Sequence, residues 1–432
     1  THNTFVNIVR YCPTGSCLAS AGADGKIIVY DGADGKELYE LGPPAHKGGV
    51  YGIAFSKDGS RMVSASADKT LKLWMIEGTQ FTFLSEYTFG SAVNNMVLGC
   101  EWIDDTIVAV TFDTSLHLFH APSGITCLDS PRAVYYGHSM HITCALFNPQ
   151  LKQLITASSD AGVASWDMDR GLATMFSGSQ AHTAQVQGMA LVDDKLVTVG
   201  FDDRCVLSDV PERSFIASVK LPSQPHGIGF SPDQNRVLVV CDQHLVLLNV
   251  IGNSLNLLEE QPLALGACTV SVSPTAGFVV ICCSSGGLFA FRIERDKLIK
   301  IGITNAPSAA TVIASFSPDG SMLAFADQDR QVTVFNVHDN GNQISLSPAI
   351  NTWWQKHTAR ITALSWSPNG RCLATGSLDT AVIVWSLDKP KDAVVLRNAH
   401  PMSNSTALSW MNDQTLVSTG HDGSIRRWKV TV

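Results

Sequence analysis

One spacing of three side chains recurs along the chain and constrains its fold more than any other feature. In the clearest copy, an aspartate lies 22 residues after His46 and a tryptophan lies six residues after that aspartate, at Asp68 and Trp74. Three copies keep this spacing unchanged and a fourth has tyrosine in place of tryptophan: His138, Asp160 and Trp166; His357, Asp379 and Trp385; His400, Asp422 and Trp428; and His2, Asp24 and Tyr30. Five such sets are not expected by chance, so the chain is built from a repeated unit.

The repeated unit has the length of a four-stranded propeller blade. Weaker copies fill the gaps between the five sets, and the bulky residue that closes the first predicted strand recurs at Tyr11, Phe55, Trp102, Phe147, Leu191, Phe230, Val272, Phe316, Trp366 and Trp410. These positions are 39 to 50 residues apart and average about 44, the period of propeller blades. Turn sequences and alternating strands lie between them, as at residues 317–320 and 71–74. We therefore expect an all-β fold of ten propeller blades.

The recurring side chains resemble the signature of WD-repeat proteins. In that family a loop histidine, a serine or threonine of the second strand, the turn aspartate and the tryptophan N–H form a hydrogen-bonded chain. The resemblance implies such a chain for His46, Ser64, Asp68 and Trp74, and for the matching residues of the other well-kept units. Histidine, serine and aspartate also occur in hydrolases, but a catalytic triad occurs once, whereas this set recurs with the blade. We therefore assign these residues to the fold and predict no catalytic residue.

Composition excludes several classes of function. The net charge of −8 and the absence of lysine or arginine runs argue against nucleic-acid binding. No apolar stretch approaches the ~18 residues that a membrane span requires, and the first residues resemble neither a signal nor a transit peptide. The 11 cysteines show no ligand spacing, so we expect reduced core residues, with no metal and no cofactor. These features predict a monomeric cytoplasmic protein.

Ten blades do not fit one ring, because closed WD propellers usually have seven. Counting back from the C-terminus predicts a seven-blade propeller over residues 131–432 and the last three blades of a second, truncated propeller over residues 1–130. We expect the chain to be the latter part of a longer two-propeller protein. The last unit ends at residues 428–432 without a fourth strand. Residues 133–136 could close that blade or complete the third one, or a strand from further upstream could close the ring; the sequence leaves these alternatives open.

Several runs of residues carry a closer resemblance. They include Thr4-Phe5-Val6-Asn7-Ile8-Val9-Arg10-Tyr11 near the start, and His357-Thr358-Ala359-Arg360-Ile361 and Val382-Ile383-Val384-Trp385 near the end. These runs are similar to the actin-interacting protein one family, whose members have two linked seven-blade propellers and cooperate with cofilin. The similarity extends from about the fifth of fourteen repeats to the end. The sequence departs from the WD-repeat pattern in the middle units, residues 191–335, where for example Ser208 stands in place of a tryptophan.

The resemblance implies a non-enzymatic protein of the actin cytoskeleton. It would bind actin filaments decorated with cofilin (actin-depolymerising factor), and sever, cap and disassemble them. The surface that family members use is thought to lie largely on the first propeller, of which this chain has only three predicted blades. Two other functions stay open at this stage. A WD-repeat scaffold of a ubiquitin ligase, coat or signalling complex would have the same fold. An enzyme would need a single polar cluster, and the sequence has no P-loop, dinucleotide fingerprint, nucleophile elbow or metal-spaced Cys/His set.

Candidate partner-binding residues follow from their place in the repeat. The top face of a WD propeller exposes the residues three and five places after the histidine and the residue before the aspartate, and we expect these positions to have no structural duty common to all repeats. An unusual residue there therefore indicates a partner, and aromatic residues are frequent interface anchors. The candidates are Phe5, Asn7, Tyr51, Arg360, Thr362 and His421. Alternatively, Phe5 and Tyr51 pack on neighbouring loops and Arg360 is merely solvated. Trp353 and Trp354 are expected to pack on an outer strand.

Overall fold

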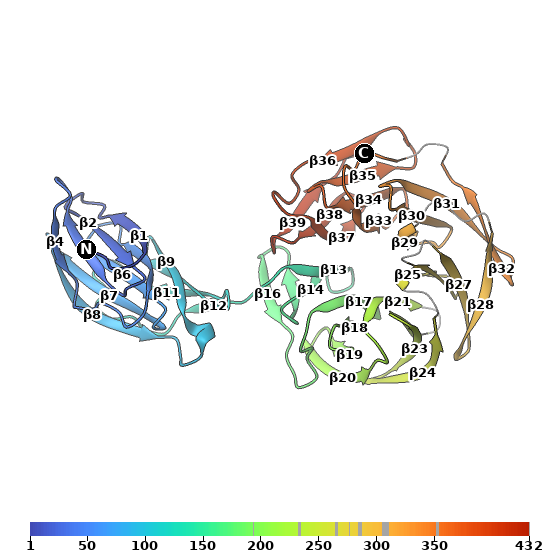
Figure 1. The fold of residues 1–432 in the computed structure, drawn as a ribbon, viewed down its shortest axis with the longest axis horizontal. Helices are drawn as coiled ribbons and strands as arrows, with labels where there is room; N and C mark the ends of the chain where they lie inside the picture. The colour runs from blue at the N-terminus through green and yellow to red at the C-terminus, as the bar shows by residue number, and fades with distance from the viewer. Residues whose placement is uncertain are drawn as a thin grey trace. The chain divides into compact units, whose positions relative to one another are not determined.

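The structure is a computed structural model that describes residues 1–192, 194–231, 235–263, 267–275, 277–283, 287–304, 311–350 and 354–431. These residues form β-strands and a single 3₁₀ turn, Val93–Asn95. The fold is therefore all-β, as the sequence predicts. Two compact units make up the chain, unit 1 over Thr1–Gly137 and unit 2 over His138–Val432 (Figure 1). Among the described residues, no helix has the length and apolarity needed to cross a bilayer.

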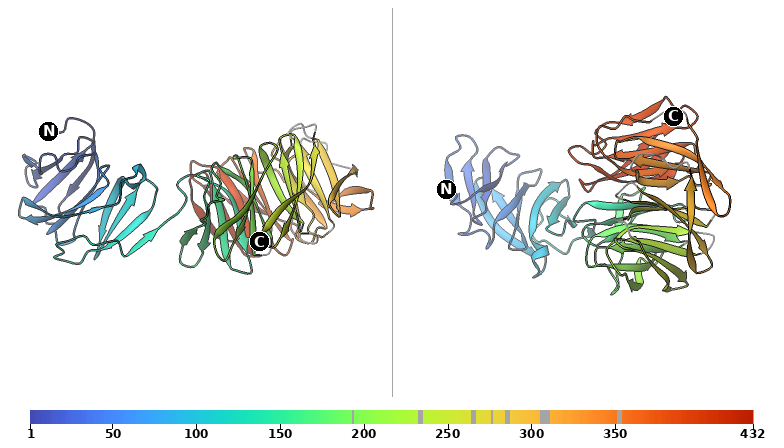
Figure 2. Two further views of the ribbon diagram at one scale, coloured as in Figure 1. Left: turned by 90° about the horizontal axis from the view of Figure 1, so that it is seen from below. Right: turned by 45° about the vertical axis from the view of Figure 1, so that its right-hand side comes forward.

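Unit 1, coloured blue to cyan in Figure 2, consists of three four-stranded antiparallel blades, and within each blade the strands neighbour one another in sequence order. The first blade contains β1 (Val6–Tyr11), β2 (Cys17–Gly22), β3 (Ile27–Asp31) and β4 (Glu37–Glu40); the second contains β5 (Val50–Phe55), β6 (Arg61–Ser66), β7 (Thr70–Glu77) and β8 (Gln80–Thr88); the third contains β9 (Val97–Ile103), β10 (Thr106–Thr111), β11 (Leu116–His120) and β12 (Ala133–Tyr135).

The blades of unit 1 stack through apolar side chains that alternate along their strands. Ile27 and Val29 of the first blade pack with Ile53 and Met62 of the second in one core. A separate core joins the second blade to the third, where Trp102 is buried. Because successive side chains of a strand point to opposite faces, one strand can supply both cores, as Met62 and Val63 of β6 do. Burial of both faces fixes the register of each blade.

Unit 2 contains seven blades arranged in a ring (Figure 1). Its strands are β13 (Ile142–Asn148), β14 (Gln153–Ser158), β15 (Val163–Asp167), β16 (Leu172–Met175), β17 (Val186–Val192), β18 (Lys195–Gly200), β19 (Arg204–Asp209), β20 (Ser214–Lys220), β21 (Pro225–Ser231), β22 (Arg236–Cys241), β23 (His244–Ile251), β24 (Ser254–Pro262), β25 (Ala267–Val272), β26 (Phe278–Cys283), β27 (Leu288–Glu294), β28 (Lys297–Thr304), β29 (Thr311–Phe316), β30 (Met322–Asp327), β31 (Val332–Asp339), β32 (Gln343–Pro348), β33 (Ile361–Trp366), β34 (Cys372–Ser377), β35 (Val382–Ser386), β36 (Ala393–Leu396), β37 (Ser405–Asn412), β38 (Thr415–Gly420) and β39 (Ile425–Lys429).

The inner strands close the ring. Each of β13, β17, β21, β25, β29 and β33 contacts the next inner strand, and β37 of the last blade contacts β13 of the first. At this junction the Phe147 N–H donates to Ser409 Oγ at 2.9 Å, and Leu154 packs with Val417 in a small core. The fold is thus one seven-blade WD-repeat propeller together with three blades in unit 1.

The structure decides where residues 133–136 belong. Strand β12 pairs antiparallel with β11, with Leu116 opposite Tyr135, and so completes the third blade of unit 1. Among the described residues, the last blade of unit 2 has three strands, β37, β38 and β39. The division between the units accordingly falls between Gly137 and His138, a few residues after the boundary expected from the sequence. Within the part of the chain that the structure describes, the ring therefore closes between its first and last blades without a strand that the two blades share.

One pairing in unit 2 is not anticipated by the repeat pattern. The outer strands β28 and β32 pair in parallel, with Ile303 opposite Ile344, and merge two blades into one eight-stranded sheet. Arg292 Nη2 also forms an ion pair with Asp339 Oδ1 at 2.5 Å between the same blades. The pairing joins the C-terminal end of β28 to the N-terminal start of β32.

Candidate functional site

The histidine, aspartate and tryptophan of the second blade lie in one hydrogen-bonded chain. His46 Nδ1 is 2.9 Å from Asp68 Oδ2 and His46 Nε2 is 2.8 Å from Ser64 Oγ. Trp74 Nε1 donates to the same Ser64 oxygen at 2.9 Å. Since an indole N–H can only donate, Ser64 accepts from Trp74 and gives its own hydrogen to His46 Nε2. The Nδ1–H of His46 is then directed at the Asp68 carboxylate.

The same arrangement recurs in the other units that keep the spacing. The histidine–hydroxyl and tryptophan–hydroxyl distances are 2.7 and 3.0 Å for His357, Thr375 and Trp385; 2.9 and 2.8 Å for His400, Ser418 and Trp428; and 2.8 and 2.6 Å for His138, Thr156 and Trp166. In the first blade His2 contacts Asp24 at 3.0 Å and Ser20 at 2.8 Å, and Ser20 contacts the Tyr30 hydroxyl at 3.3 Å. The sets span the blade from its entry loop to its third strand.

Burial and hydrogen bonding shift the pKa values of these groups in opposite directions. Burial raises the pKa of Asp68, but hydrogen bonds from His46 and Thr70 outweigh it, and the pKa lies below its usual range. Burial lowers the pKa of His357, although Asp379 opposes that shift. Ser64 is fully buried, so no substrate can reach its hydroxyl. A buried imidazole bound to a carboxylate on one side and a hydroxyl on the other braces the blade.

A further set was missed in the sequence because its spacing differs. His182 Nδ1 is 2.9 Å from Asp202 Oδ1, and its Nε2 is 2.9 Å from Thr198 Oγ1. The aspartate here lies 20 residues after the histidine rather than 22, and Ser208 occupies the place of the tryptophan. A search that allowed a shorter loop would have found it. Among the described residues, no group of three or more His, Cys, Asp or Glu side chains is placed to hold a metal ion.

The predicted top-face positions lie together at one edge of each blade. The backbone N–H of the residue before the aspartate donates to the carbonyl of the residue three places after the histidine. Examples are Ala23 to Phe5 at 2.9 Å and Leu378 to Arg360 at 3.0 Å. The third blade of unit 1 has no such histidine, yet Phe112 N–H donates to Met96 O in the same way at 2.8 Å. These backbone bonds hold the edge rigid and leave the side chains free to project.

Large apolar side chains are exposed along this edge of unit 1. We call Phe5, Tyr51, Leu98 and Phe112 the unit 1 rim; their exposed fractions are 85, 41, 39 and 49%. With 85% of its side chain exposed, Phe5 does not pack on a neighbouring loop, whereas Tyr51 is partly covered. Counting from the histidine does not locate Leu98 and Phe112, because the third repeat lacks that histidine. Aligning its first strand with that of the second repeat, residues 97–98 on residues 50–51, would have identified Leu98.

Two of the predicted partner-binding residues tie neighbouring blades together. Asn7 Nδ2 donates to Val50 O at 2.9 Å and Thr362 Oγ1 donates to Ser405 O at 2.6 Å. Thr143 and Thr269 make the same kind of contact with the blade that follows them. This position therefore has a structural role in some repeats, where a short polar side chain reaches the next inner strand, but not in all of them. Tyr51, at the same position, instead projects into solvent.

The remaining candidates lie on the corresponding edge of unit 2. The Arg360 side chain is exposed. His421 of the last blade stacks on His141 of the first, with ring centroids 3.7 Å apart and an interplanar angle of 20°. Trp354 is fully buried, and its ring stacks on that of Trp385 with centroids 5.2 Å apart. Its N–H donates to Pro390 O, so its side chain belongs to the core of unit 2. Trp353 lies outside the described residues.

Comparisons with known proteins are consistent with this architecture. The family model for the WD domain, G-beta repeat, matches residues 1–31, 35–75, 129–167, 349–386 and 394–429. Actin-interacting protein 1 of Drosophila melanogaster is 32% identical over 435 residues, which cover 99% of this chain and 68% of the relative. Actin-interacting protein 1 of Caenorhabditis elegans is 31% identical over 99% of this chain and 69% of its own. WD repeat-containing protein 1 of Mus musculus is 32% identical over 100% and 69%.

Proposed function

Because this chain belongs to the family of actin-interacting protein 1 and WD repeat-containing protein 1, we propose that it is a non-enzymatic actin-binding protein. It binds actin filaments that carry cofilin, and it promotes their severing, the capping of the new ends and their disassembly. The observation that carries this proposal is the similarity to relatives named for actin interaction over nearly the whole chain. Its proposed location is the actin cytoskeleton of the cytoplasm, where it acts as a monomer.

The unit 1 rim supports the proposal because it supplies anchors for a partner. Its four side chains are large, apolar and at least 39% exposed, and they come from three successive blades. Burying such a side chain contributes about 1.5–3 kcal/mol. Several anchors distributed over adjacent blades suit a polymer, which offers a broad surface rather than a pocket. We therefore assign the main contact with the filament to Phe5 and Tyr51, together with Leu98 and Phe112.

Unit 2 contributes a second, polar contact in this proposal. Arg360 and His421 present a guanidinium and an imidazole to a partner with acidic side chains. Asn7 and Thr362 make no contact with the partner in this proposal, because their side chains are hydrogen-bonded to the next blade and serve stability. Exposed charged pairs are worth at most about 1 kcal/mol each, so the polar contact adds specificity more than affinity.

No chemical step is needed for disassembly in this mechanism. A rigid surface that fits the cofilin-decorated filament better than the bare filament shifts the equilibrium between the two filament states by the difference in binding free energy. The backbone bonds at the blade edges and the buried histidine sets supply the rigidity. A tenfold preference for decorated filaments corresponds to about 1.4 kcal/mol, which one additional buried anchor can provide.

Co-sedimentation tests the proposal. The chain is mixed with actin filaments, with and without cofilin, and the pelleted fraction is measured over a range of filament concentrations. We expect saturable pelleting that is stronger with cofilin, and a faster loss of filament mass when both proteins are present. Pelleting that is absent under both conditions would contradict the proposal and would favour the WD-repeat scaffold of another complex. Pelleting that does not depend on cofilin would retain actin binding and contradict cooperation.

A further inference from the structure

Two methionine side chains of unit 2 are exposed to solvent, although methionine more often fills gaps in a core. The chain has ten methionines, and all of them lie among the described residues. Met402 has an exposed fraction of 102%, so it is as accessible as in an extended chain, and Met140 has an exposed fraction of 53%. The others are buried or partly buried. Accessibility therefore separates Met402 from every other thioether of the protein.

Both methionines lie in the loops that lead into the first strand of their blades. Each follows the loop histidine of its blade by two residues. The corresponding loop of another blade carries the exposed Arg360. Met402 therefore lies on the same edge of unit 2 as the polar contact that we assign to Arg360 and His421.

The two loops meet at the junction between the first and last blades. Met140 directly precedes His141, whose ring stacks on that of His421. Met402 lies two residues before Asn404, and the Asn404 carbonyl accepts a hydrogen bond from the His421 N–H at 3.0 Å. The two methionines therefore belong to the loops that position the stacked imidazoles.

Hydrogen bonds fix the backbone of both loops. The Ser158 hydroxyl donates to Met140 O at 3.3 Å. The Ser403 N–H donates to His400 O at 3.1 Å, and His400 belongs to the buried hydrogen-bonded set of the last blade. Met402 itself has a φ of 55°, a left-handed conformation that is uncommon for a residue with a side chain. The loop therefore presents the Met402 side chain to solvent from a defined position.

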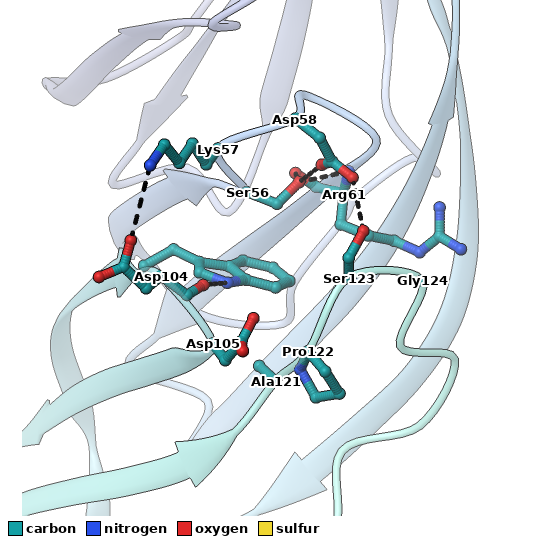
Figure 3. A pocket seen from close by; sticks show the side chains of 11 residues that line it. Ser56, Lys57, Asp58, Arg61, Asp104, Asp105, Ala121, Pro122, Ser123 and Gly124 are labelled. Carbon is teal, nitrogen blue, oxygen red and sulfur yellow. Dashed lines mark hydrogen bonds and ion pairs between the residues drawn. The ribbon is translucent and has the colours of Figure 1, made fainter.

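A flexible apolar side chain on a fixed loop suits an interface between proteins. The thioether is polarizable, and its rotatable bonds let it fit an irregular partner surface. The cleft between the second and third blades of unit 1, about 440 Å³ in volume, differs in this respect (Figure 3). There the Trp102 side chain is only 8% exposed, and Lys57 and Asp104 pair with each other at 3.8 Å. Of the two features, the loop methionines offer a partner the more accessible apolar group.

We propose that Met402 anchors unit 2 on the actin filament and that oxidation of its sulfur by hydrogen peroxide releases this contact. The inference rests on the proposed function, which places this edge of unit 2 against the filament. Met140, which is less exposed, is oxidised more slowly. The buried methionines are protected by the core that surrounds them.

The reaction is a two-electron transfer of one oxygen atom. The thioether sulfur attacks the peroxide and the O–O bond breaks; one oxygen forms the S=O bond of methionine sulfoxide and the other leaves as water. The sulfur is oxidised and the peroxide is reduced, so no further reactant is needed. The sulfoxide is polar, and methionine sulfoxide reductases return it to the thioether. Loss of the apolar anchor is thereby reversible.

The first measurement is the order in which the methionines are oxidised. The full chain is exposed to increasing doses of hydrogen peroxide, quenched with catalase and digested for peptide mass spectrometry. We expect sulfoxide at Met402 to form at least about fivefold faster than at the buried Met62 and Met189. Equal rates at these three positions would overturn the assignment of Met402 as the oxidisable site.

The second measurement is filament binding by the oxidised chain. Peroxide is removed before actin and cofilin are added, and dithiothreitol reverses oxidation of the exposed Cys127 while it leaves sulfoxides in place. We expect the dissociation constant from cofilin-decorated filaments to rise about fivefold, and methionine sulfoxide reductases to restore it. Met402→Leu keeps an apolar side chain without an oxidisable sulfur, so peroxide should leave its binding unchanged.

Polar variants test the anchoring role without peroxide. Met402→Gln should weaken binding about fivefold, whereas Leu257→Gln, at an exposed leucine of β24, should leave it unaltered. Thermal unfolding shows that each variant retains its fold. Unchanged pelleting by the oxidised chain or by Met402→Gln would overturn the anchoring role alone. Absent pelleting by the reduced, unaltered chain would overturn the proposed function and the anchoring role together.

Discussion

His421 of the last blade lies flat against His141 of the first blade, with ring centroids 3.7 Å apart, and so spans the junction at which the seven-blade ring closes. Burial lowers the pKa of His141, and the proximity of His421 lowers it further, although Asp160 acts in the opposite direction. Both rings belong to loops rather than to paired strands. The closing contact of unit 2 therefore contains one histidine, His141, whose pKa is lowered in the folded protein.

The His141–His421 pair predicts a pH dependence of stability. Because the pKa of folded His141 is below 6.5, the unfolded chain takes up a proton first as the pH falls. The stabilisation is therefore complete above about pH 6.5 and is lost as the pH falls from there through the folded pKa. In His421→Gln the decrease in melting temperature from pH 7.5 to 5.5 should be smaller, by roughly 1–3 °C. His120→Gln, an exposed histidine of unit 1, serves as the control and should retain the full decrease.

Removing a single hydroxyl from the hydrogen-bonded set of the second blade should lower the stability of unit 1 substantially. Ser64→Ala leaves His46 Nε2 and Trp74 Nε1 without their shared partner, which should destabilise unit 1 by about 1–3 kcal/mol. Urea unfolding followed by tryptophan fluorescence measures this difference. Ser91→Ala, at an exposed serine of the same unit, should change stability by less than about 0.5 kcal/mol. Equal stability of the two variants would show that the hydrogen-bonded set does not brace the blade.

The blade tie at Thr362 separates a structural role from a binding role. Thr362→Val keeps the shape but removes the hydrogen bond to Ser405 O, and should destabilise unit 2 by about 0.5–1.5 kcal/mol. Thr362→Ser retains the donor and should lose less. Filament pelleting by folded Thr362→Val protein should equal that of the unaltered protein. A stable variant with weakened pelleting would instead place the Thr362 side chain in the actin interface.

Substitutions in the unit 1 rim should change filament binding and leave stability unaltered, the reverse of what is expected for Thr362→Val. Phe5→Ala removes a side chain that is 85% exposed, so the melting temperature should stay within about 1 °C. The dissociation constant from cofilin-decorated filaments should rise about tenfold, because an interface aromatic is lost. Ile251→Ala removes an exposed apolar side chain at the end of β23 in unit 2 and should leave pelleting unchanged. Unaltered pelleting by Phe5→Ala would exclude Phe5 as an anchor.

Much of the fold follows from the sequence because the repeat itself is periodic. The spacing of His46, Asp68 and Trp74 gives the length of a blade, and the structure brings these side chains within hydrogen-bonding distance of Ser64. The pairing of β28 with β32 could not be predicted, because it joins outer strands of two different blades and depends on how far each strand extends. The place of β12 stayed open for a related reason, since a three-residue strand carries too short a pattern to select its neighbour.

The candidate surface was only partly predictable. Counting from the histidine correctly locates the edge at which Phe5 and Tyr51 are exposed. The same count cannot tell whether a side chain projects outward or reaches the next blade, as Asn7 does toward Val50 O. It also fails where the histidine is missing, and so passes over Leu98 and Phe112.

Each histidine set connects strands of its own blade, and none of those described spans two blades. Damage to one set is consequently confined. The blade that contains Ser208 illustrates this tolerance. It lacks the indole but keeps His182 bound to Asp202 and Thr198. Its inner strand still contacts the inner strands of both neighbouring blades. Each blade therefore carries its own internal stabilisation, and a blade can lose part of it while the closed ring persists.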